Sequence, residues 1–311
     1  MPYFSIVVPC YNAVAHIDAT IQSVIDQTFQ DWELILVDDG STDGTSALLH
    51  CWRHRDTRIK VIRLENGGPA RARNIGVLEI AQGDVIAFLD SDDLWSKARL
   101  AELYHVFRRA DAPAAAFNRV GFFRDQPQKL DAFSTVPMDP VQALDFLAEN
   151  PVCTMSNLAV QMAAFQKTGG FNERMVHNED MEWLIRLAAS GATIQGINRL
   201  MTYYRVSVTG LSANLTSMHQ GWRDAVATAE RLGLAPSQAY LARAEAIQMR
   251  YLARRALRTC APGMAALKLA LLALRASPSG FFDTPRRGLA TLAGALIAPV
   301  LPRRLHQQLF S

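Results

Sequence analysis

Three aspartates stand at the end of a strongly apolar run. Asp90, Asp92 and Asp93 lie within four residues where the run Val85–Asp90 ends. Acids this close repel one another, and a divalent cation relieves the repulsion. Side chains two positions apart in an extended segment point the same way, so Asp90 and Asp92 can share one ion, for which oxygen ligands favour Mg²⁺ or Mn²⁺. The alternative for Asp92 and Asp93 is capping of a helix that begins near Ser96.

A second acidic turn lies between residues 37 and 44. It reads Val-Asp-Asp-Gly-Ser-Thr-Asp-Gly, and its glycines allow a tight turn. A carboxylate in this turn can accept hydrogen bonds from the N–H of a base or from ribose hydroxyls. The alternative is an Asx-turn that caps the helix beginning at Thr45. The sequence favours capping for Asp43 and ligand binding for Asp39.

Two arginines open the helix that follows a glycine-rich loop. Arg71 and Arg73 come shortly after Gly67 and Gly68. Helix N-termini and guanidinium groups both suit phosphate oxygens. The alternative is a surface helix whose arginines are solvated. The loop has neither the lysine spacing of a P-loop nor the G-x-G-x-x-G pattern of a dinucleotide fold.

A fourth group of acids opens a later helix. Glu179, Asp180 and Glu182 lie near the start of the amphipathic segment 177–187. A favourable interaction with the helix dipole explains acids at this position without any function. The functional interpretation is a general base at Asp180.

The segments that carry these groups alternate between short β-branched runs and helical patterns, which is typical of parallel βαβ units. The predicted strands are Ser5–Pro9, Leu34–Asp38, Ile59–Leu64 and Val85–Asp90, and the predicted helices are Ala15–Gln27, Thr45–Arg55 and Pro69–Ala81. The strands show little alternation, which predicts helices on both faces of the sheet. Ligands of such sheets bind beyond the carboxyl ends of the strands, where these acids lie.

The rest of the chain is less regular. Prolines break the pattern over residues 111–160, where we expect variation in substrate contacts. A helix at Asp180–Ala189 and a β-rich stretch at Thr193–Val206 follow. Beyond about residue 220 the composition of Ala, Leu and Arg predicts a helical appendage. Within it, Gly288–Pro302 is bracketed by arginines and is shorter than the ~20 residues needed to span a bilayer, which favours an interfacial or buried helix.

The composition bounds the class of protein. The chain has 311 residues, of which 50% are hydrophobic and 20% charged, as in globular proteins. A net charge of +3 does not indicate a broad basic surface for binding nucleic acid. The four cysteines lack the spacing of a zinc site or disulfide framework and are expected to fill the core in a reducing compartment. The N-terminal MPYFSIVVP is not a secretory signal, which favours a cytoplasmic protein.

In order and spacing, these motifs resemble the family 2 glycosyltransferases, the inverting, nucleotide-sugar-dependent enzymes of the GT-A fold. The resemblance covers roughly residues 3–215. Each motif is modest by itself, but the ordered set is specific. It consists of Ser5–Asn12, Val37–Asp43, Ala72–Asn74, Asp90–Asp93 and Glu179–Asp180.

The resemblance implies a nucleotide site. Pro9, Tyr11 and Asp39 would hold the nucleotide, with the tyrosine against the base and the acid at the edge of the base. Stacking on an aromatic ring tolerates any base, so this contact does not identify the base. Arg71 or Arg73 would help to bind the charge of the diphosphate.

The resemblance also implies a metal and a base. Asp90 and Asp92 match the family's D-x-D, which coordinates Mg²⁺ or Mn²⁺ on the donor diphosphate, and Asp90 would also contact the nucleotide. Asp180 falls on the catalytic base, which takes the proton from the acceptor hydroxyl. Glu179 would orient the site, and Trp183 would pack or line the acceptor pocket.

The resulting prediction is an α/β protein with a mostly parallel central sheet flanked by helices. A GT-A domain would cover residues 1–215, with its nucleotide-binding half at about 1–110 and its acceptor half at about 111–215, and a helical C-terminal region would cover 216–311. The protein would transfer a sugar from a nucleotide-diphosphate sugar, with a UDP-sugar as first candidate, to a carbohydrate or lipid-linked acceptor. The products would be cell-surface polysaccharides or glycolipids.

Two alternatives and a location complete the prediction. A nucleotidyltransferase is disfavoured because Pro9–Asn12 stands where those enzymes carry a loop rich in Gly and Arg. A catalytically silent GT-A-like binding module is disfavoured because clustered acids are costly without a ligand. No nucleic-acid partner is expected. The C-terminal helices suit a peripheral contact with the cytoplasmic face of the inner membrane, or a partner helix, or the core.

Overall fold

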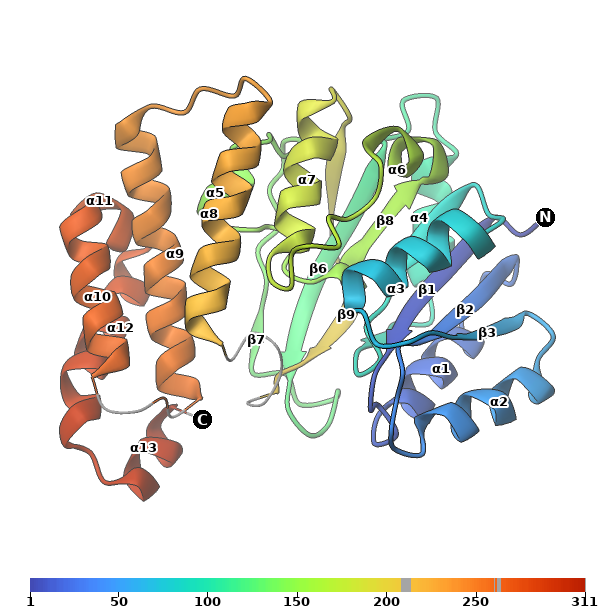
Figure 1. Ribbon diagram of the computed structural model, residues 1–311, viewed down its shortest axis with the longest axis horizontal. Coiled ribbons are helices and arrows are strands. Elements are labelled where there is room, and N and C mark those ends of the chain that lie inside the picture. The colour runs from blue at the N-terminus through green and yellow to red at the C-terminus, as the bar shows by residue number, and fades with distance from the viewer. Residues whose placement is uncertain (208–213, 260, 262–263, 311) are drawn as a thin grey trace. The chain divides into compact units, whose positions relative to one another are not determined.

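The computed structural model describes residues 1–207, 214–259, 261 and 264–310, which belong to two compact units. The first unit comprises Met1–Gln142 and Pro151–Val206, and the second comprises Ala143–Asn150 and Ser207–Ser311. The first unit is built around a sheet, whereas the second consists of helices (Figure 1).

In the described residues of the first unit, nine strands form one mixed sheet in the order β3-β2-β1-β4-β8-β6-β9-β5, with β7 paired to β6. The strands are β1 (Phe4–Cys10), β2 (Trp32–Asp38), β3 (Ile59–Arg63), β4 (Val85–Phe88), β5 (Leu94–Trp95), β6 (Ala115–Phe123), β7 (Ala132–Phe133), β8 (Leu158–Gln161) and β9 (Ile194–Arg205). The first four run parallel to one another, and β8 is antiparallel to both β4 and β6. The N-terminal half therefore contributes four parallel strands, and β6 and β9 form a further parallel pair.

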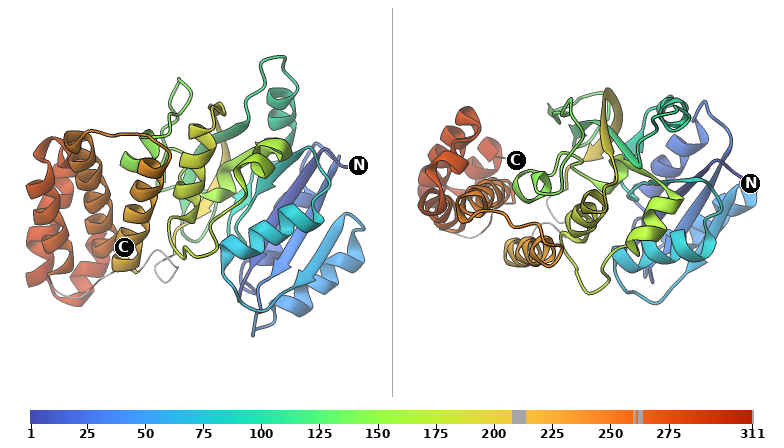
Figure 2. Two further views of the ribbon diagram at one scale, coloured as in Figure 1. Left: turned by 45° about the horizontal axis from the view of Figure 1, so that its top comes forward. Right: turned by 90° about the horizontal axis from the view of Figure 1, so that it is seen from above.

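Helices cover both faces of the parallel strands, as predicted. They are α1 (Ile17–Ile25), α2 (Thr45–Arg55), α3 (Pro69–Ile75), α4 (Arg99–Phe107), α6 (Met162–Thr168) and α7 (Glu179–Ala189). One face of β1 and β2 packs in a core with α1, α2 and α4. On the other face, a Cβ at Gly76 would lie 2.6 Å from Cγ1 of Val7, so the chain after α3 approaches the sheet as closely as only glycine allows. Figure 2 shows this layering from two further directions.

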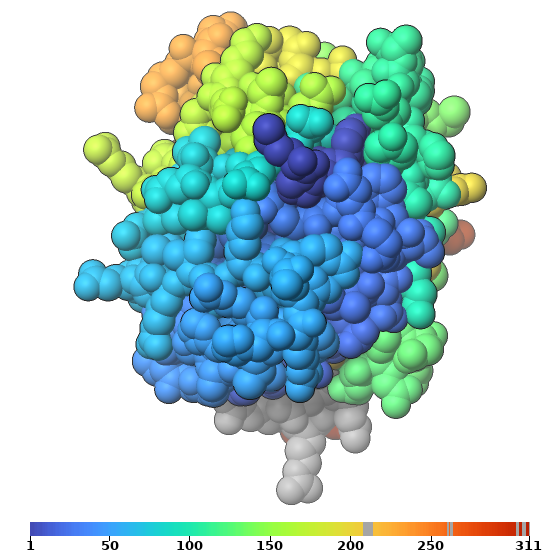
Figure 3. All heavy atoms as spheres, turned by 90° about the vertical axis from the view of Figure 1, so that its right-hand side faces the viewer, coloured from blue at the N-terminus to red at the C-terminus, as the bar shows by residue number. Residues whose placement is uncertain are grey.

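The four strands and three helices predicted for the N-terminal half are confirmed, with ends shifted by a few residues. The predicted helix Pro69–Ala81 is α3 followed by a π-helical turn, Gly76–Ile80. Residues of this half, blue to cyan, dominate the face in Figure 3. The expectation that the cysteines fill the core holds for Cys10 but is wrong for Cys51 and Cys153, which are exposed. Cys260 lies outside the described residues.

The second unit is helical, in agreement with the composition of its sequence. Its elements are α5 (Asp145–Ala148), α8 (Leu215–Arg231), α9 (Gln238–Arg258), α10 (Ala265–Ala276), α11 (Pro278–Phe281), α12 (Pro285–Ile297), the 3-10 turn η4 (Ala298–Val300) and α13 (Arg303–Phe310). Alanines of α9 and α10 supply much of the core. Among the described residues, no helix combines the length and the apolar character needed to cross a membrane.

Candidate active site

The loops that follow β1 and β2 are joined by hydrogen bonds at the carboxyl edge of the sheet. Because these strands pair in parallel, their loops leave the sheet at the same edge. The backbone N–H of Asn12 donates to Oγ of Ser41 (3.1 Å), and Oδ1 of Asn12 accepts from the N–H of Thr42 (2.8 Å). The N–H of Ala13 donates to Oγ1 of Thr45 (2.8 Å). The two loops therefore act as one platform.

Tyr11 projects from this platform. Its side chain is 53% exposed, so the ring is accessible for stacking, while Pro9 is half-buried in β1. The nucleotide-binding roles of Tyr11 and Pro9 stay predictions. Asp43 is a capping residue, since its carboxylate accepts from the N–H of Thr45 (2.9 Å) and of Val14 (3.3 Å). The capping interpretation of Asp43 is confirmed.

Asp39 holds the glycine-rich loop. Its carboxylate is buried and accepts the backbone N–H of Gly67 (2.8 Å) and of Gly68 (2.8 Å), and the side-chain amide of Asn66 donates to it as well (3.3 Å). Gly68 has a φ of 89°, which favours glycine. Asp39 thus connects the edge of this platform to the start of α3, and its contact with a base stays a prediction.

Arg73 lies at the centre of the candidate site. Its buried guanidinium donates from Nη2 to Oδ1 of Asp90 (2.7 Å) and from Nη1 to Oε1 of Glu179 (3.1 Å). Arg71 instead donates to the carbonyl of Glu65 (2.9 Å) at the surface. The two arginines that the sequence left undistinguished therefore differ, because only Arg73 links the acids after β4 to those at the start of α7.

Replacing Arg73 with methionine is expected to lower the free energy of unfolding by ~3 kcal/mol or more, because two acids would lose their shared buried cation. Urea unfolding followed by circular dichroism measures this. Arg71→Met is the matched control, for which we expect a change of about 0.5 kcal/mol or less. Equal losses in the two variants would contradict the bridging role.

The acids after β4 have unequal environments. Asp93 is fully buried and accepts from Oγ of Ser156 (2.6 Å) and from the N–H of Arg205 in β9 (2.8 Å), so its predicted alternative role as a helix cap is wrong. Burial, followed by the charges of Asp92 and Asp90, raises the pKa of Asp93 well above its usual range. Asp92 is half-buried, and burial together with Asp90 raises its pKa to about 6.

Asp90 and Asp92 fit a divalent cation. Asp90 pairs with Arg73, whereas no described residue forms an ion pair with Asp92, whose raised pKa reflects burial and the charge of Asp90. Within the part of the chain that the structure describes, no three or more His, Cys, Asp or Glu side chains form a metal cluster. Two carboxylates completed by phosphate oxygens and water match the way in which Mg²⁺ is usually bound.

Asp180 and Glu179 open α7, where the chain turns through Asn178 with a φ of 58°. Burial raises the pKa of Asp180, whereas the N–H of Met181 (2.8 Å from Oδ1) and the charge of Arg73 oppose the rise. Burial and Asp180 raise the pKa of Glu179 to about 7, against the opposing charge of Arg73. An acid with a raised pKa beside bound substrate is suited to general base catalysis near neutral pH.

Folding stability is expected to decrease as the pH rises from about 4.5 through about 7, because Glu179 binds its proton more tightly in the folded chain than in the unfolded chain. Glu179→Gln keeps the neutral form and should flatten this decrease by up to ~3 kcal/mol. Urea unfolding at several pH values measures it, with the exposed Glu65→Gln as control. A Glu179→Gln profile as steep as that of the unmodified protein would contradict this origin.

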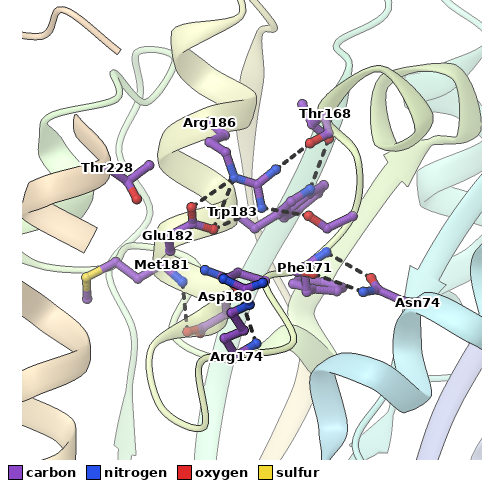
Figure 4. Close-up of polar contacts among 12 residues, drawn as sticks. Asn74, Thr168, Phe171, Arg174, Asp180, Met181, Glu182, Trp183, Arg186 and Thr228 are labelled. Atoms are coloured by element: carbon purple, nitrogen blue, oxygen red, sulfur yellow. Dashed lines mark hydrogen bonds and ion pairs between the residues drawn. The ribbon is translucent and has the colours of Figure 1, made fainter. Parts of the chain in front are cut away.

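Figure 4 shows how α7 is anchored. The carboxylate of Glu182 accepts from the guanidinium of Arg186 one turn later (2.9 Å), and Arg186 also donates to the carbonyls of Thr168 and Gly170. Nε1 of Trp183 donates to Oγ1 of Thr168 (3.0 Å). Contacts along the helix body therefore hold the start of α7, where Asp180 lies.

Trp183 has a packing role. The side chain is fully buried against the rings of Phe165 and Phe171, so it has no exposed surface in this structure with which to line an acceptor pocket. The sequence analysis included Asn74 in the motif Ala72–Asn74 but assigned it no role. Its side-chain amide exchanges two hydrogen bonds with the backbone of Phe171 (2.9 and 2.8 Å), a contact that no local pattern predicts.

A sheet of this order, with acids at its carboxyl edge, defines a protein of the GT-A glycosyltransferase class. Residues 5–168 match the model of glycosyl transferase family 2, and the chain belongs to this family. TuaG of Bacillus subtilis (strain 168), named for teichuronic acid biosynthesis, is 34% identical over 215 residues, which cover 68% of this chain and 82% of TuaG. Escherichia coli WfaP, a UDP-Glc:alpha-D-GlcNAc-diphosphoundecaprenol beta-1,3-glucosyltransferase, is 29% identical over 219 residues, which cover 69% of this chain and 81% of WfaP.

Solved structures confirm the predicted GT-A fold. S. aureus TarS (residues 1–349) superimposes with a TM-score of 0.64 and 18% identity, covering 99% of this chain and 90% of TarS. A mannosyltransferase from Pyrobaculum calidifontis, solved with GDP-Man and Mn²⁺, gives a TM-score of 0.61 and 21% identity, with 97% of this chain and 88% of that chain covered. The protein is therefore a glycosyltransferase with an α/β catalytic fold and additional C-terminal helices.

Proposed function

We propose that the protein transfers a sugar from a UDP-sugar to a hydroxyl of a saccharide or lipid-linked acceptor, with inversion and with Mg²⁺ or Mn²⁺ as cofactor. The observation that carries this proposal is the Arg73 bridge, because one buried guanidinium contacts both Asp90 and Glu179, the neighbour of Asp180. This contact supports a single site for the donor diphosphate and the base.

The chemistry follows from the residues. Asp180 would accept the proton of the acceptor hydroxyl while its oxygen attacks the anomeric carbon from the face opposite the diphosphate. The bond from that carbon to the diphosphate oxygen breaks in the same step, so UDP leaves with the bonding electrons. Asp90 and Asp92 would hold the metal ion, which stabilises the leaving diphosphate when bound. Arg73 would hold the acids after β4 close to those at the start of α7 by its contacts with Asp90 and Glu179.

The relatives support the donor and the product class. The name of WfaP specifies UDP-Glc and a diphosphoundecaprenol-linked acceptor, and the name of TuaG refers to a cell-wall polymer. The structure of S. aureus TarS has been solved with UDP-GlcNAc, but the similarity of this chain to TarS supports only the fold. Synthesis of a cell-surface polysaccharide or glycolipid is the process that these names support.

The test is a panel of UDP-sugars offered with Mn²⁺ and saccharide or diphospho-lipid acceptors. We expect UDP release and a product whose anomeric configuration, read by NMR, is opposite to that of the donor. Retained configuration would overturn the inverting mechanism. Release of pyrophosphate from UTP and a sugar 1-phosphate would favour a nucleotidyltransferase, and metal-dependent UDP binding without any transfer would favour a silent binding module.

A further inference from the structure

Positive charge is concentrated at the C-terminal end of the chain. Residues 246–311 contain ten Lys and Arg residues and one Asp, whereas residues 1–245 contain 22 Lys and Arg residues and 28 acids. The nearly neutral protein thus combines a segment of net charge +9 with a remainder of net charge −6. Such asymmetry is typical of proteins whose basic part meets a polyanionic surface.

Helix α12 has large aliphatic side chains on its outside. On the inner side Gly288, Thr291, Gly294 and Ala295 are buried and Leu292 packs partly buried against the core, whereas the outer side carries Leu289, Leu296 and Ile297, followed by Val300 in η4. Leu289 is 61% exposed and Val300 is 79% exposed. A surface helix of a globular protein normally shows the opposite arrangement. We call the four large outer residues the aliphatic face.

The inner side of α12 is closely packed at Gly294. A Cβ at Gly294 would lie 3.0 Å from Cδ1 of Leu257 in α9 and 2.9 Å from the ring of Phe310 in α13. Helix α10 repeats the pattern, with Ala270 and Ala273 buried and two adjacent leucines, Leu271 and Leu272, exposed. The exposed leucines are therefore a recurring feature of this unit, and apolar surface of this kind usually marks an interaction site.

An exposed arginine borders the aliphatic face. Arg286 is exposed and lies three residues before Leu289, on the same side of α12, and Arg303 and Arg304 follow Val300 in the sequence. An exposed aliphatic strip between basic residues has the chemistry of a helix that lies in the headgroup region of a bilayer.

A second group of arginines lies between α9 and α12. Arg254 is half-buried near Arg250, Arg258 and Arg287, with Glu149 and, close to Arg250, Asp283 as the nearby acids. Arg287 pairs with Glu149 (2.9 Å), and Arg250 donates to the carbonyl of Phe281, which does not neutralise its charge. Burial and the neighbouring arginines lower the pKa of Arg254 to about 10. A phosphate group would relieve this repulsion.

We propose that the aliphatic face docks on the surface of an anionic lipid bilayer, with Leu289, Leu296, Ile297 and Val300 at the acyl boundary and the surrounding arginines against phosphate headgroups. Charge complementarity selects this occupant, because a second copy of the chain would bring two segments of net charge +9 together. The proposal rests on residues 246–311 and is independent of the reaction catalysed by the first unit.

The experiment is co-sedimentation of the full chain with vesicles of phosphatidylcholine alone or with a quarter of phosphatidylglycerol. We expect binding to the anionic vesicles to be ~10-fold stronger or more, and to weaken when NaCl is raised from about 0.1 M to about 0.5 M. Leu296→Glu with Ile297→Glu should lower anionic-vesicle binding by ~10-fold or more. Arg286→Glu, which keeps the aliphatic face, should also weaken it.

The matched control carries glutamates at two exposed apolar positions outside this segment, Met138 (98% exposed) and Leu232 (44% exposed). This variant should bind vesicles like the unmodified protein, and circular dichroism should show all variants folded. Absence of binding to anionic vesicles, or equal losses in control and α12 variants, would overturn the proposal. A dimer in vesicle-free solution that Leu296→Glu with Ile297→Glu dissociates would assign the aliphatic face to a second copy instead.

Discussion

Replacing Asp180 with asparagine is expected to lower sugar transfer by ~10²-fold or more at saturating donor, because an amide cannot take the proton of the acceptor hydroxyl. The change is nearly isosteric, and the amide oxygen can still accept the N–H of Met181, as Oδ1 of the carboxylate does (2.8 Å). The start of α7 should therefore keep its shape. Steady-state kinetics should show a fall in kcat, while calorimetric titration with UDP and Mn²⁺ should be nearly unchanged.

The control for this experiment is Asp139→Asn, which alters an exposed acid outside the candidate site. It should transfer sugar at the rate of the unmodified protein. If Asp180→Asn were equally active, Asp180 would have no part in the mechanism. A loss of UDP binding as large as the loss of transfer would mean that the site had been distorted and not that a base had been removed.

Replacing Asp92 with alanine is expected to weaken metal-dependent UDP binding by ~10-fold or more, as loss of a ligand to the cation should. Unlike Asp90, which pairs with Arg73, Asp92 forms no ion pair with a described residue, and its pKa is raised to about 6 by burial and Asp90. Its removal should therefore leave the fold intact. The measurement is isothermal titration of UDP with Mn²⁺ and again with EDTA.

Asp93→Ala provides the contrast, because Asp93 is bonded to Ser156 and to the backbone of Arg205. Its removal should lower the free energy of unfolding by about 1–3 kcal/mol, since two buried donors lose their acceptor. Titration curves for Asp92→Ala that match those of the unmodified protein, with and without metal, would exclude Asp92 as a ligand.

The sequence predicted the elements that local patterns determine. The β-branched runs of β1 to β4 and the helices between them follow from periodicity, and the parallel arrangement follows from their alternation. Because parallel strands end at the same edge of a sheet, the acids after β2 and β4 were predicted to lie together at the carboxyl edge. These inferences needed no contact between residues far apart in the chain.

Contacts between residues far apart in the sequence could not be predicted from local patterns. The partners of Arg73 lie 17 and 106 positions away, and no pattern in the sequence distinguishes it from Arg71. Asp93 stands where a helix cap would be expected. Its carboxylate instead accepts a hydrogen bond from the backbone N–H of Arg205 in β9, 112 positions later. The composition predicted helices after residue 220, whereas the outward position of the leucines in α12 depends on what packs against Gly294.

The bond between Asp93 and Arg205, together with the pairing of β5 with β9, has a consequence for biosynthesis. A nascent chain that has emerged only as far as residue 168 already contains the whole stretch matched by the family model, including all three acids of the cluster. In such a chain the three acids nevertheless lack β9, the strand that bonds to Asp93 and pairs with β5. The packing around the three acids can therefore be completed only after translation has passed Arg205, and a fragment that ends earlier would contain the acids without the contacts that hold them.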